Sequence, residues 1–312
     1  VAPGRGGELP AAGGGSGGGC QAPAVPAALA PLNIVFMIDK SASMGAQDTN
    51  GDGDHDDTTE WDNRATRWDP VTAALIAFLE NPGAEGLHAT LGFFPVGDIP
   101  TAPDTGICSR EQYENPAVPL QSLDDPAAVE LLVAQIEGIT PSGGTPTLPA
   151  LEGAIEVARR ARAENPGSSS AVVMVTDGLP AIARVVDGAV YAEKCFCYGE
   201  PGCPDQDEIP YVAQAAQMGA ADGIPTFVIG MGDVGFDPLH TIAAAGDTGQ
   251  AYIVDADDPS MTQERLAAAF GSVRSVQAPC DLALPVAPEG EAFDRLLVNL
   301  ELVSSGGLVQ PI

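Results

Sequence analysis

The sequence predicts an α/β fold with a doubly wound, mostly parallel sheet and helices on both faces. Uninterrupted apolar runs at 34–38 and 171–176 are too short for helices and rich in β-branched residues, which is typical of strands buried on both faces. Segments with apolar residues at helical spacing alternate with such runs, and this alternation favours parallel strands covered by helices. The 312 residues are enough for one large domain with tails, or for two domains.

The elements are expected in the following order. Strands are predicted at 34–38, 87–94, 171–176, 224–229 and 251–254, and helices at 69–80, 126–137, 148–163, 208–221, 236–245 and 259–273. Asp69 followed by Pro70 is typical of a helix start, with a capping residue before a first-turn proline. Residues 95–123 are rich in proline, and we expect an irregular segment there.

Two of the predicted strands end in an acidic residue. Asp39 follows the first run and Asp177 follows the second. Ligands bind outside the carboxyl ends of parallel strands, so both carboxylates are expected at one edge of the sheet. Ser41 and Ser43 come shortly after Asp39, and a carboxylate with neutral oxygens suits a small hard cation rather than zinc or copper. A serine-rich turn that caps the next element is the alternative interpretation.

A loop between these two strands opens a helical stretch. It runs over 142–147 with the sequence SGGTPT, and its Thr145 would supply a third hydroxyl to the same edge. The sequence supports equally well an N-cap role for Thr145, with Pro146 at the first helical position. That role does not exclude a contact with a metal.

Three motifs in this order resemble the von Willebrand factor type A domain and its metal-ion-dependent adhesion site. They are Asp39-Lys40-Ser41-Ala42-Ser43, Gly143-Gly144-Thr145-Pro146-Thr147 and Thr176-Asp177-Gly178. The resemblance extends over 31–276, where we expect the domain, and the segments at 67–69 and 226–232 are similar to secreted bacterial members. Lys40 departs from the pattern of a cation site, but side chains alternate along an extended segment, so we expect it to point away.

The resemblance implies what the site binds. Mg²⁺, or else Mn²⁺ or Ca²⁺, would be held by oxygen atoms of Asp39, Ser41, Ser43, Thr145 and Asp177. The remaining position on the ion would accept a carboxylate from an Asp or Glu of a protein partner. The neutral hydroxyls would leave the ion electron-poor and therefore attractive to that carboxylate.

A second cation site is predicted in the acidic loop at 48–60. Its glycine at the sixth place and its oxygen-bearing side chains follow calcium-loop spacing, with candidate ligands Asp48, Asn50, Asp52, Asp54, Asp56 and Glu60. The match fails at the twelfth place, where Thr59 stands instead of the bidentate Glu. So many acids would repel one another without a counter-ion, which favours Ca²⁺ over a solvated acidic loop.

The composition argues against two classes of partner. Asp and Glu number 43 against 13 Lys and Arg, which gives a formal net charge of -30. Such a chain is not expected to bind nucleic acid or an anionic membrane, and its charge favours cation binding and solubility. The longest apolar runs have the length of strands, so no membrane span is expected.

All six cysteines fall outside the predicted strands and helices: Cys20, Cys108, Cys195, Cys197, Cys203 and Cys280. This placement favours disulfides and a secreted, extracellular or cell-surface protein. The first residue, Val1, indicates a chain that was processed or cut from a longer one. A zinc site from Cys195, Cys197 and Cys203 is the rival interpretation, but their spacing differs from common zinc sites. The resemblance implies a Cys20–Cys280 bond; Cys108 would then pair with Cys195 or Cys197, and Cys203 with the other.

Three segments lie outside the predicted helices and main sheet. Residues 1–30 are almost entirely Gly, Ala and Pro, which favours a flexible tether over a segment packed on a neighbouring molecule. Residues 179–207 form a cysteine-containing insertion near the predicted site, which would shape ligand choice or serve as a disulfide-pinned cover. Residues 277–312 are expected to form a β extension, with a strand around 296–303 that pairs with the domain, another subunit or a further domain.

The leading hypothesis is an extracellular, non-enzymatic adhesion or protein-binding module. The alternative is a structural subunit of an extracellular assembly, rigidified by metals and disulfides and self-assembling through its C-terminal strand. A metal-assisted phosphohydrolase that uses Asp39 is less favoured. Such catalysis would need a nearby acid–base group, but His55, His88 and His240 are far from the motifs in sequence, and Lys40 is the only obvious base.

Overall fold

A computed structural model of the chain describes residues 31–45, 67–80, 86–96, 109–142, 145–177, 184–186, 189–191, 209–231, 237–254, 259–273, 301–303 and 309–311. These residues belong to two units. One runs from Leu29 to Cys280, and the other combines Val1–Ala28 with Asp281–Ile312. The predicted tether, the acidic loop at 48–60 and all six cysteines lie outside the described residues, as does most of the insertion at 179–207.

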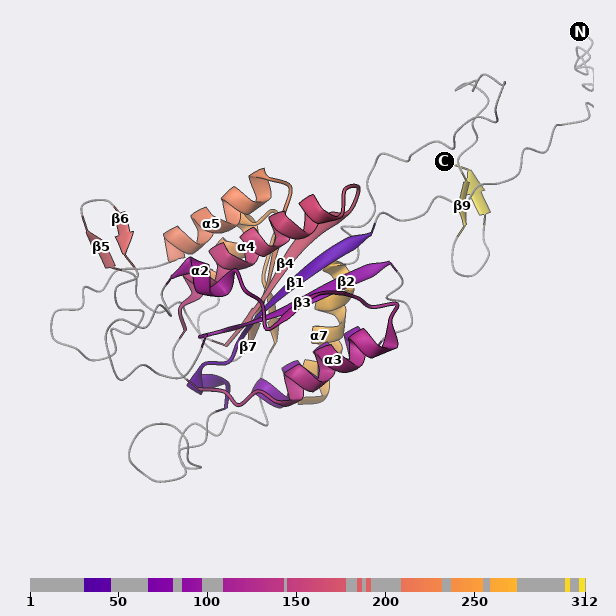
Figure 1. The fold of residues 1–312 in the computed structure, drawn as a ribbon, viewed down its shortest axis with the longest axis horizontal. Coiled ribbons are helices and arrows are strands. Elements are labelled where there is room, and N and C mark those ends of the chain that lie inside the picture. The colour runs from indigo at the N-terminus through magenta and orange to yellow at the C-terminus, as the bar shows by residue number, and fades with distance from the viewer. Residues whose placement is uncertain are drawn as a thin grey trace, which may run out of the picture. The chain divides into compact units, whose positions relative to one another are not determined.

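The larger unit is built on a six-stranded sheet (Figure 1). Its order is β3-β2-β1-β4-β7-β8, with β1 at Leu32–Asp39, β2 at Leu87–Phe94, β3 at Val118–Ser122, β4 at Ser169–Thr176, β7 at Thr226–Met231 and β8 at Tyr252–Val254. Neighbouring strands run parallel except for β3, which pairs with β2 in the antiparallel sense. Strand β1 is buried along its whole length, as expected of a central strand with helices on both faces.

Helices cover both faces of this sheet, which confirms the predicted doubly wound architecture. One face packs against α1 (Asp69–Leu79), α3 (Pro126–Glu137) and α7 (Pro259–Val273). The other face packs against α2 (Arg110–Tyr113), α4 (Thr147–Glu164), α5 (Ile209–Ala221) and α6 (Asp237–Ala245). The α3/α7 side and the α4/α5 side can be followed in Figure 1. The carboxyl ends of the parallel strands therefore meet at one edge of the sheet.

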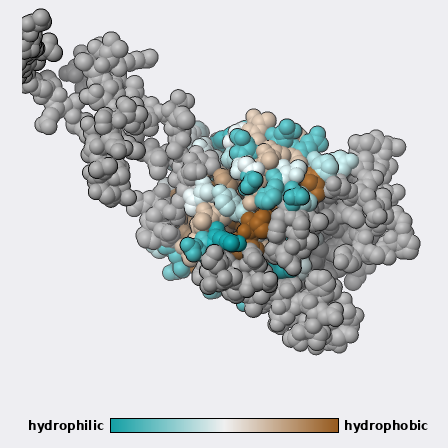
Figure 2. All heavy atoms as spheres, turned by 180° about the vertical axis from the view of Figure 1, so that it is seen from behind, coloured by the Kyte–Doolittle hydropathy of each residue, from teal (hydrophilic) through white to brown (hydrophobic). Residues whose placement is uncertain are grey.

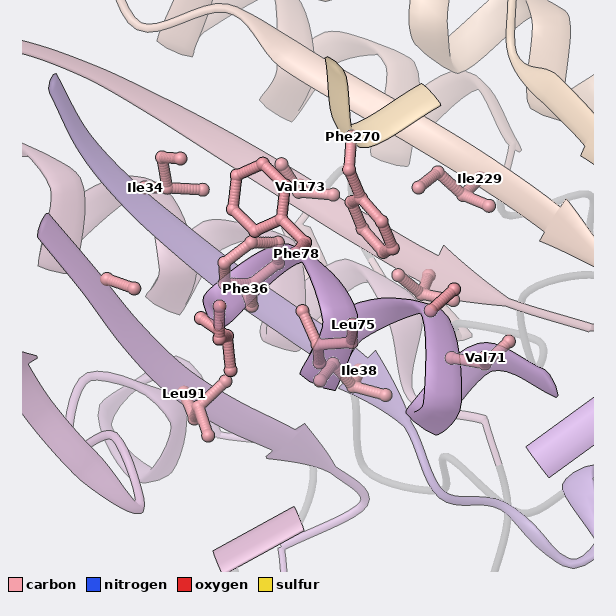
Figure 3. Close-up of a cluster of buried hydrophobic side chains, with 14 of the residues drawn as sticks. Ile34, Phe36, Ile38, Val71, Leu75, Phe78, Leu91, Val173, Ile229 and Phe270 are labelled. Carbon is pink, nitrogen blue, oxygen red and sulfur yellow. The ribbon is translucent and has the colours of Figure 1, made fainter. Parts of the chain in front are cut away.

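Three aromatic rings attach the helices α1 and α7 to the central strand (Figure 3). Phe36 of β1 meets Phe78 of α1 and Phe270 of α7 edge to face, with ring centroids 5.8 Å apart in both pairs. Phe78 and Phe270 also contact each other, with centroids 5.5 Å apart. Such ring pairs contribute about 0.5–1.5 kcal/mol each beyond the apolar area that they bury. The last helix of the unit is thus fixed directly to the strand that ends in Asp39.

The described surface mixes hydrophilic and hydrophobic residues on the face seen from behind (Figure 2). Among the residues that the structure describes, two large apolar side chains are exposed, Leu131 on α3 and Met218 on α5, and these helices cover opposite faces of the sheet. Across the part of the chain that the structure describes, no helix combines the length and the apolar character that crossing a bilayer requires.

The stretch at 95–123, predicted to be irregular, contains two regular elements. The four-residue helix α2 is fixed by Tyr113, which is buried against α4 beside Gly153. The edge strand β3 is fixed by pairing with β2 and by Val118, which is buried. Each element thus has few buried anchors, too few to leave a periodic pattern in the sequence. The prediction was wrong here because tertiary contacts decide the local structure.

The start of α1 also differs from the prediction. Trp68 rather than Asp69 holds the N-cap position, with φ −63° and ψ −53° in the helical region and no side-chain cap bond. Trp68 is buried in the core, and its carbonyl oxygen accepts a hydrogen bond from the Thr72 hydroxyl at 2.9 Å. Burial of the indole therefore extends the helical backbone by one residue, while Pro70 stays in the first turn as predicted.

Two short antiparallel hairpins complete the described elements. Strands β5 (Arg184–Val186) and β6 (Ala189–Tyr191) pair inside the insertion at 179–207. Strands β9 (Glu301–Val303) and β10 (Val309–Pro311) pair in the smaller unit. Strand β9 coincides with the last three residues of the strand expected at 296–303.

Candidate functional site

Asp39 ends β1 at the carboxyl edge of the sheet, and its side chain is fully buried. Its Oδ1 accepts a hydrogen bond from the backbone N–H of Ser41 at 2.7 Å, and its Oδ2 accepts one from the Thr176 hydroxyl at 2.6 Å. Thr176 is the last residue of the neighbouring strand β4, so the carboxylate bridges two central strands. Both donors are neutral, so they orient the carboxylate without balancing its charge.

A short 3-10 turn, η1 (Ala42–Met44), carries the second predicted serine and follows the first. The hydroxyl oxygens of Ser41 and Ser43 lie 3.1 Å apart, and the Ser43 hydroxyl donates to Oδ1 of Asp177 at 2.9 Å. Met44 anchors the turn, because its side chain is buried in the core and its N–H donates to the Ser41 carbonyl oxygen at 3.0 Å. A turn that only capped the next element would not need the bond to Asp177.

Four of the five predicted metal ligands therefore meet in one hydrogen-bonded group, the carboxylate cluster: Asp39, Ser41, Ser43 and Asp177. The cluster forms because β1 and β4 are parallel neighbours whose registers align Ile38 with Val175. The residues that follow these two positions come to the same edge of the sheet, where the turn at η1 folds back over them. The prediction that both acids share one edge is confirmed.

Arg67, which the sequence did not single out as a site residue, joins the cluster. Its Nη1 lies 2.5 Å from Oδ2 of Asp177 and 3.3 Å from the carbonyl oxygen of Ser43. Arg67 immediately precedes the buried Trp68, which fixes the backbone from which the guanidinium extends. The sequence shows Arg67 beside Trp68 at the start of the first helix, but its partner Asp177 lies 110 residues away and leaves no local pattern.

The electrostatics of the cluster favour a cation. Burial, together with the nearby charge of Asp177, raises the pKa of Asp39 to about 7, although hydrogen bonds from Ser41 and Thr176 act in the opposite direction. Burial also raises the pKa of Asp177, and the Arg67 guanidinium and the Ser43 hydroxyl oppose that rise. Two carboxylates that repel each other in a buried site gain most from a positive charge placed between them.

The loop that carries Thr145 is tied to the cluster through the backbone. The N–H of Ser142 donates to the carbonyl oxygen of Lys40 at 2.6 Å. The N–H of Lys40 in turn donates to the carbonyl oxygen of Phe94 at 2.7 Å. Thr145 itself is half-buried, and its carbonyl oxygen accepts hydrogen bonds from the N–H and the hydroxyl of Thr147. The structure thus brings this loop beside the β1 turn, and Thr145 stays a predicted ligand.

The alternative N-cap role of Thr145 is wrong. Helix α4 begins at Thr147, and the N-cap position is occupied by Pro146, with no side-chain cap bond. Pro146 has φ −75° and ψ 69°, outside the helical region, so the helix starts one residue later than the cap pattern implied. The Thr145 hydroxyl is therefore not used as a cap at this helix start.

The carboxylate cluster has the donor set of a small divalent cation. Carboxylate and hydroxyl oxygens are hard ligands of the kind that Mg²⁺, Mn²⁺ and Ca²⁺ prefer. Within the described residues, no three or more His, Cys, Asp or Glu side chains gather to hold a metal. An ion here would therefore depend on the serine hydroxyls as well as on Asp39 and Asp177. The cluster already binds one positively charged group, the guanidinium of Arg67. Its oxygen atoms therefore suit the cation that the motifs imply.

Comparison with known proteins gives structural matches alone. No family model matches the sequence, and no curated protein matches it. The pilus adhesin SpaC from Lactobacillus rhamnosus GG, in its open conformation, is similar over 78% of this chain with a TM-score of 0.51 and 17% identity. The PilB minor pilin from Streptococcus sanguinis is similar over 80% with a TM-score of 0.49 and 16% identity. A von Willebrand factor type A protein from Catenulispora acidiphila is similar over 78%, with a TM-score of 0.43 and 15% identity.

These matches cover only part of the similar proteins. The chain spans 30% of the SpaC chain, 62% of the PilB chain and 43% of the Catenulispora chain. At such low identity the likeness concerns the fold. The larger unit combines this likeness with a parallel sheet of order β3-β2-β1-β4-β7-β8 and helices on both faces. The chain therefore has the doubly wound α/β fold that the resemblance of its three motifs to the von Willebrand factor type A domain implies.

Proposed function

We propose that this chain is an extracellular or cell-surface adhesion module that captures a carboxylate of a protein partner at a divalent cation. The observation that carries the proposal is the carboxylate cluster, in which Asp39 accepts the backbone N–H of Ser41, the hydroxyls of Ser41 and Ser43 lie 3.1 Å apart, and the Ser43 hydroxyl donates to Asp177. The site lies at the carboxyl edge of a parallel sheet, where this class of fold binds its ligands.

The residues proposed to hold the cation are Asp39, Ser41, Ser43, Thr145 and Asp177, with Mg²⁺ the best fit and Mn²⁺ or Ca²⁺ as substitutes. When bound, the cation supplies an electron-poor position for an incoming oxygen atom. The chain's own part is to fix its oxygens before the ion arrives: the Ser41 N–H and the Thr176 hydroxyl hold the Asp39 carboxylate in place. A Ca²⁺ ion in the acidic loop, at Asp48, Asn50, Asp52, Asp54, Asp56 and Glu60, remains a second prediction.

Burial of the cluster makes it selective for a charged partner group. Asp39 is 0% and Asp177 is 5% exposed, so charges in the cluster are poorly screened by water. The serine hydroxyls are neutral, and they leave much of the positive charge of a dication uncompensated. A carboxylate from an Asp or Glu side chain is the protein group best suited to balance that charge.

The comparison with SpaC supports a role at the cell surface. SpaC is described as a pilus adhesin, and this chain shares its fold over 78% of the present sequence. The charge of -30 is consistent with a surface that does not bind nucleic acid. A protein partner, an extracellular location and disulfides among the six cysteines therefore belong to the same proposal.

The placement of two histidines supports a binding role over a phosphohydrolase. His88 pairs in register with Asn33 near the start of β1, at the opposite end of the strand from Asp39. His240 lies on α6, and its Nδ1 accepts a hydrogen bond from the N–H of Ala251 at 3.1 Å. Neither side chain is placed to act as an acid or base at the carboxylate cluster.

The β9–β10 hairpin favours a second candidate, in which the chain is a subunit of an extracellular assembly. Among the described residues these two strands pair only with each other, so their outer edges can accept a further strand. Light scattering over a concentration series tests this candidate. Growth in mass that is lost in Leu302→Pro, which removes an N–H from β9, would support assembly; a constant monomer mass would contradict it.

Water-proton relaxation of the Mn²⁺-loaded chain tests the leading proposal. The tripeptide Gly-Asp-Gly should displace water from the bound ion and lower the relaxation enhancement, whereas Gly-Asn-Gly, which lacks the carboxylate, should not. Asp39→Ala should remove the part of the enhancement that Gly-Asp-Gly lowers, because it removes a proposed ligand. Equal responses to the two peptides would refute carboxylate capture, and an Asp39→Ala variant that binds as many Mn²⁺ ions as the wild type would refute the site.

A further inference from the structure

The ion pair between Arg67 and Asp177 is a feature of the site that the proposed function does not use. The described donors to Asp39 are a backbone N–H and a hydroxyl, whereas Asp177 receives a guanidinium. The side chain of Asp177 has no exposed surface, and that of Arg67 is 16% exposed. Among the described residues, Arg67 thus brings a positive charge into direct contact with this buried acid pair.

The contact with Asp177 is made by a single nitrogen of the guanidinium. Nη1 donates to Oδ2 of Asp177 at 2.5 Å and to the carbonyl oxygen of Ser43 at 3.3 Å. Nε is buried and has no hydrogen-bond partner among the described residues. An arginine that serves as a permanent partner of a carboxylate frequently binds it with two parallel N–H bonds. The observed contact leaves a buried donor unsatisfied, which is a costly arrangement if it is the only one that Arg67 adopts.

Asp177 stands between Arg67 and the serines. Its Oδ1 accepts the Ser43 hydroxyl, and its Oδ2 accepts Nη1 of Arg67. A divalent ion that binds oxygens of Ser43 and Asp177 would bring two further positive charges next to the guanidinium. Because the site is buried, the two cations would repel each other strongly. A bound divalent ion would therefore weaken the contact between Arg67 and Asp177, and that contact would in turn weaken binding of the ion.

We propose that Arg67 and the divalent cation are alternative counter-ions of Asp177, so that metal binding releases the guanidinium and Arg67 sets the metal affinity. This inference rests on the proposed function, because it takes the carboxylate cluster to be the metal site. The structure allows the release, since the buried Trp68 anchors the start of α1 independently of the ion pair. The Arg67 side chain is also partly exposed, whereas that of Asp177 is not.

Calorimetric titration of the full chain with Mn²⁺ is the first test. Arg67→Gln should bind Mn²⁺ about ten- to a hundredfold more tightly than the wild type, because a charge-assisted hydrogen bond no longer competes for Asp177. Arg67→Lys keeps the positive charge but lacks the planar guanidinium group, so its affinity for Mn²⁺ should lie between those of the wild type and Arg67→Gln. Arg159→Gln is the matched control: it removes one positive charge that pairs with Glu156 on the same helix, α4, and with Asp222 just after α5, and it should leave the affinity unchanged. Equal or weaker binding by Arg67→Gln would overturn the inference.

Nitrogen-15 NMR of the guanidinium groups in the wild-type chain is the second test, and it needs a variant, Arg67→Lys, only to assign the signal. Mg²⁺ should shift the Arg67 side-chain resonance and speed its proton exchange with water, while the Arg159 resonance stays in place. The absence of a resonance in Arg67→Lys assigns the signal. An Arg67 signal that does not move while Mg²⁺ binds would show that the guanidinium stays on Asp177, and would overturn the exchange.

Failure of this inference can be told from failure of the proposed function. If the wild type and Asp39→Ala take up Mn²⁺ equally, the carboxylate cluster is not the metal site and both fail. If the wild type binds and Asp39→Ala does not, but Arg67→Gln equals the wild type, the metal site stands and the counter-ion exchange alone is wrong.

Discussion

Asparagine in place of Asp39 should stabilise the metal-free protein while it removes the metal site. The side chain keeps its shape, and its amide oxygen can still accept the N–H of Ser41, as Oδ1 does now at 2.7 Å. The amide NH₂ can donate to the hydroxyl of Thr176, which now donates to Oδ2. The substitution therefore removes the buried charge and retains the two hydrogen-bond contacts.

The size of the effect follows from the pKa of Asp39. Burial and the charge of Asp177 raise it from 3.8 to about 7, a difference that corresponds to roughly 4 kcal/mol. Because the folded-state pKa lies above the unfolded value, the contribution of this group to stability is fully present below pH 3.8 and is lost as pH rises through about 7. Asp39→Asn should therefore raise the free energy of unfolding by about 2–4 kcal/mol at pH 8 and by less than about 1 kcal/mol at pH 4.

Urea unfolding followed by circular dichroism, at pH 4 and pH 8 with a chelator present, measures this difference. Glu137→Gln is the control, because it removes one negative charge from an exposed position at the end of α3. Added Mg²⁺ should stabilise the wild type by mass action and leave Asp39→Asn unchanged. A variant that is no more stable than the wild type at pH 8, or whose gain is the same at both pH values, would refute the electrostatic reasoning.

Four further substitutions have expected outcomes. Phe270→Ala should lower the free energy of unfolding by about 3–5 kcal/mol in urea titration, because it empties the ring cluster that fixes α7 to β1; a loss below about 1 kcal/mol would contradict that packing. Gly153→Ala should cost about 1–3 kcal/mol, since its Cβ would lie 2.4 Å from Cβ of Tyr113, whereas Gly271→Ala, in open space on α7, should gain about 0.5–1 kcal/mol in the same assay. Ser43→Ala should weaken Mn²⁺ binding at least about tenfold in calorimetry, because it removes a proposed ligand that also contacts Asp177; unchanged affinity would exclude Ser43 from the site.

The sequence predicts the acids of the site because each one ends a strand. Asp39 and Asp177 follow apolar runs long enough to read as buried strands, and parallel neighbours bring such ends together. Ser41 and Ser43 are found by the same argument, because they lie within one turn of Asp39. These residues are predictable because short-range pattern and sheet geometry suffice to place them.

Other parts of the structure depend on contacts that leave no local pattern. The pairing of Arg67 with Asp177 spans 110 residues and is decided by where α1 starts, which the buried Trp68 sets. Strand β3 contains Pro119 and one buried residue, Val118, so its place in the sheet depends on β2. In both cases the contact is made with a distant part of the chain, so it cannot be predicted from the local sequence and is seen only in the folded structure.

The backbone bonds at Lys40 have a consequence for how this protein can evolve. Just after the end of β1, Lys40 links two other parts of the chain through its backbone: its N–H donates to Phe94 at the end of β2, and its carbonyl oxygen accepts from Ser142. These bonds require an N–H and a carbonyl but no particular side chain, so every residue except proline can maintain them. Any substitution at position 40 except proline should therefore leave this backbone frame intact, whatever contact the lysine side chain itself makes.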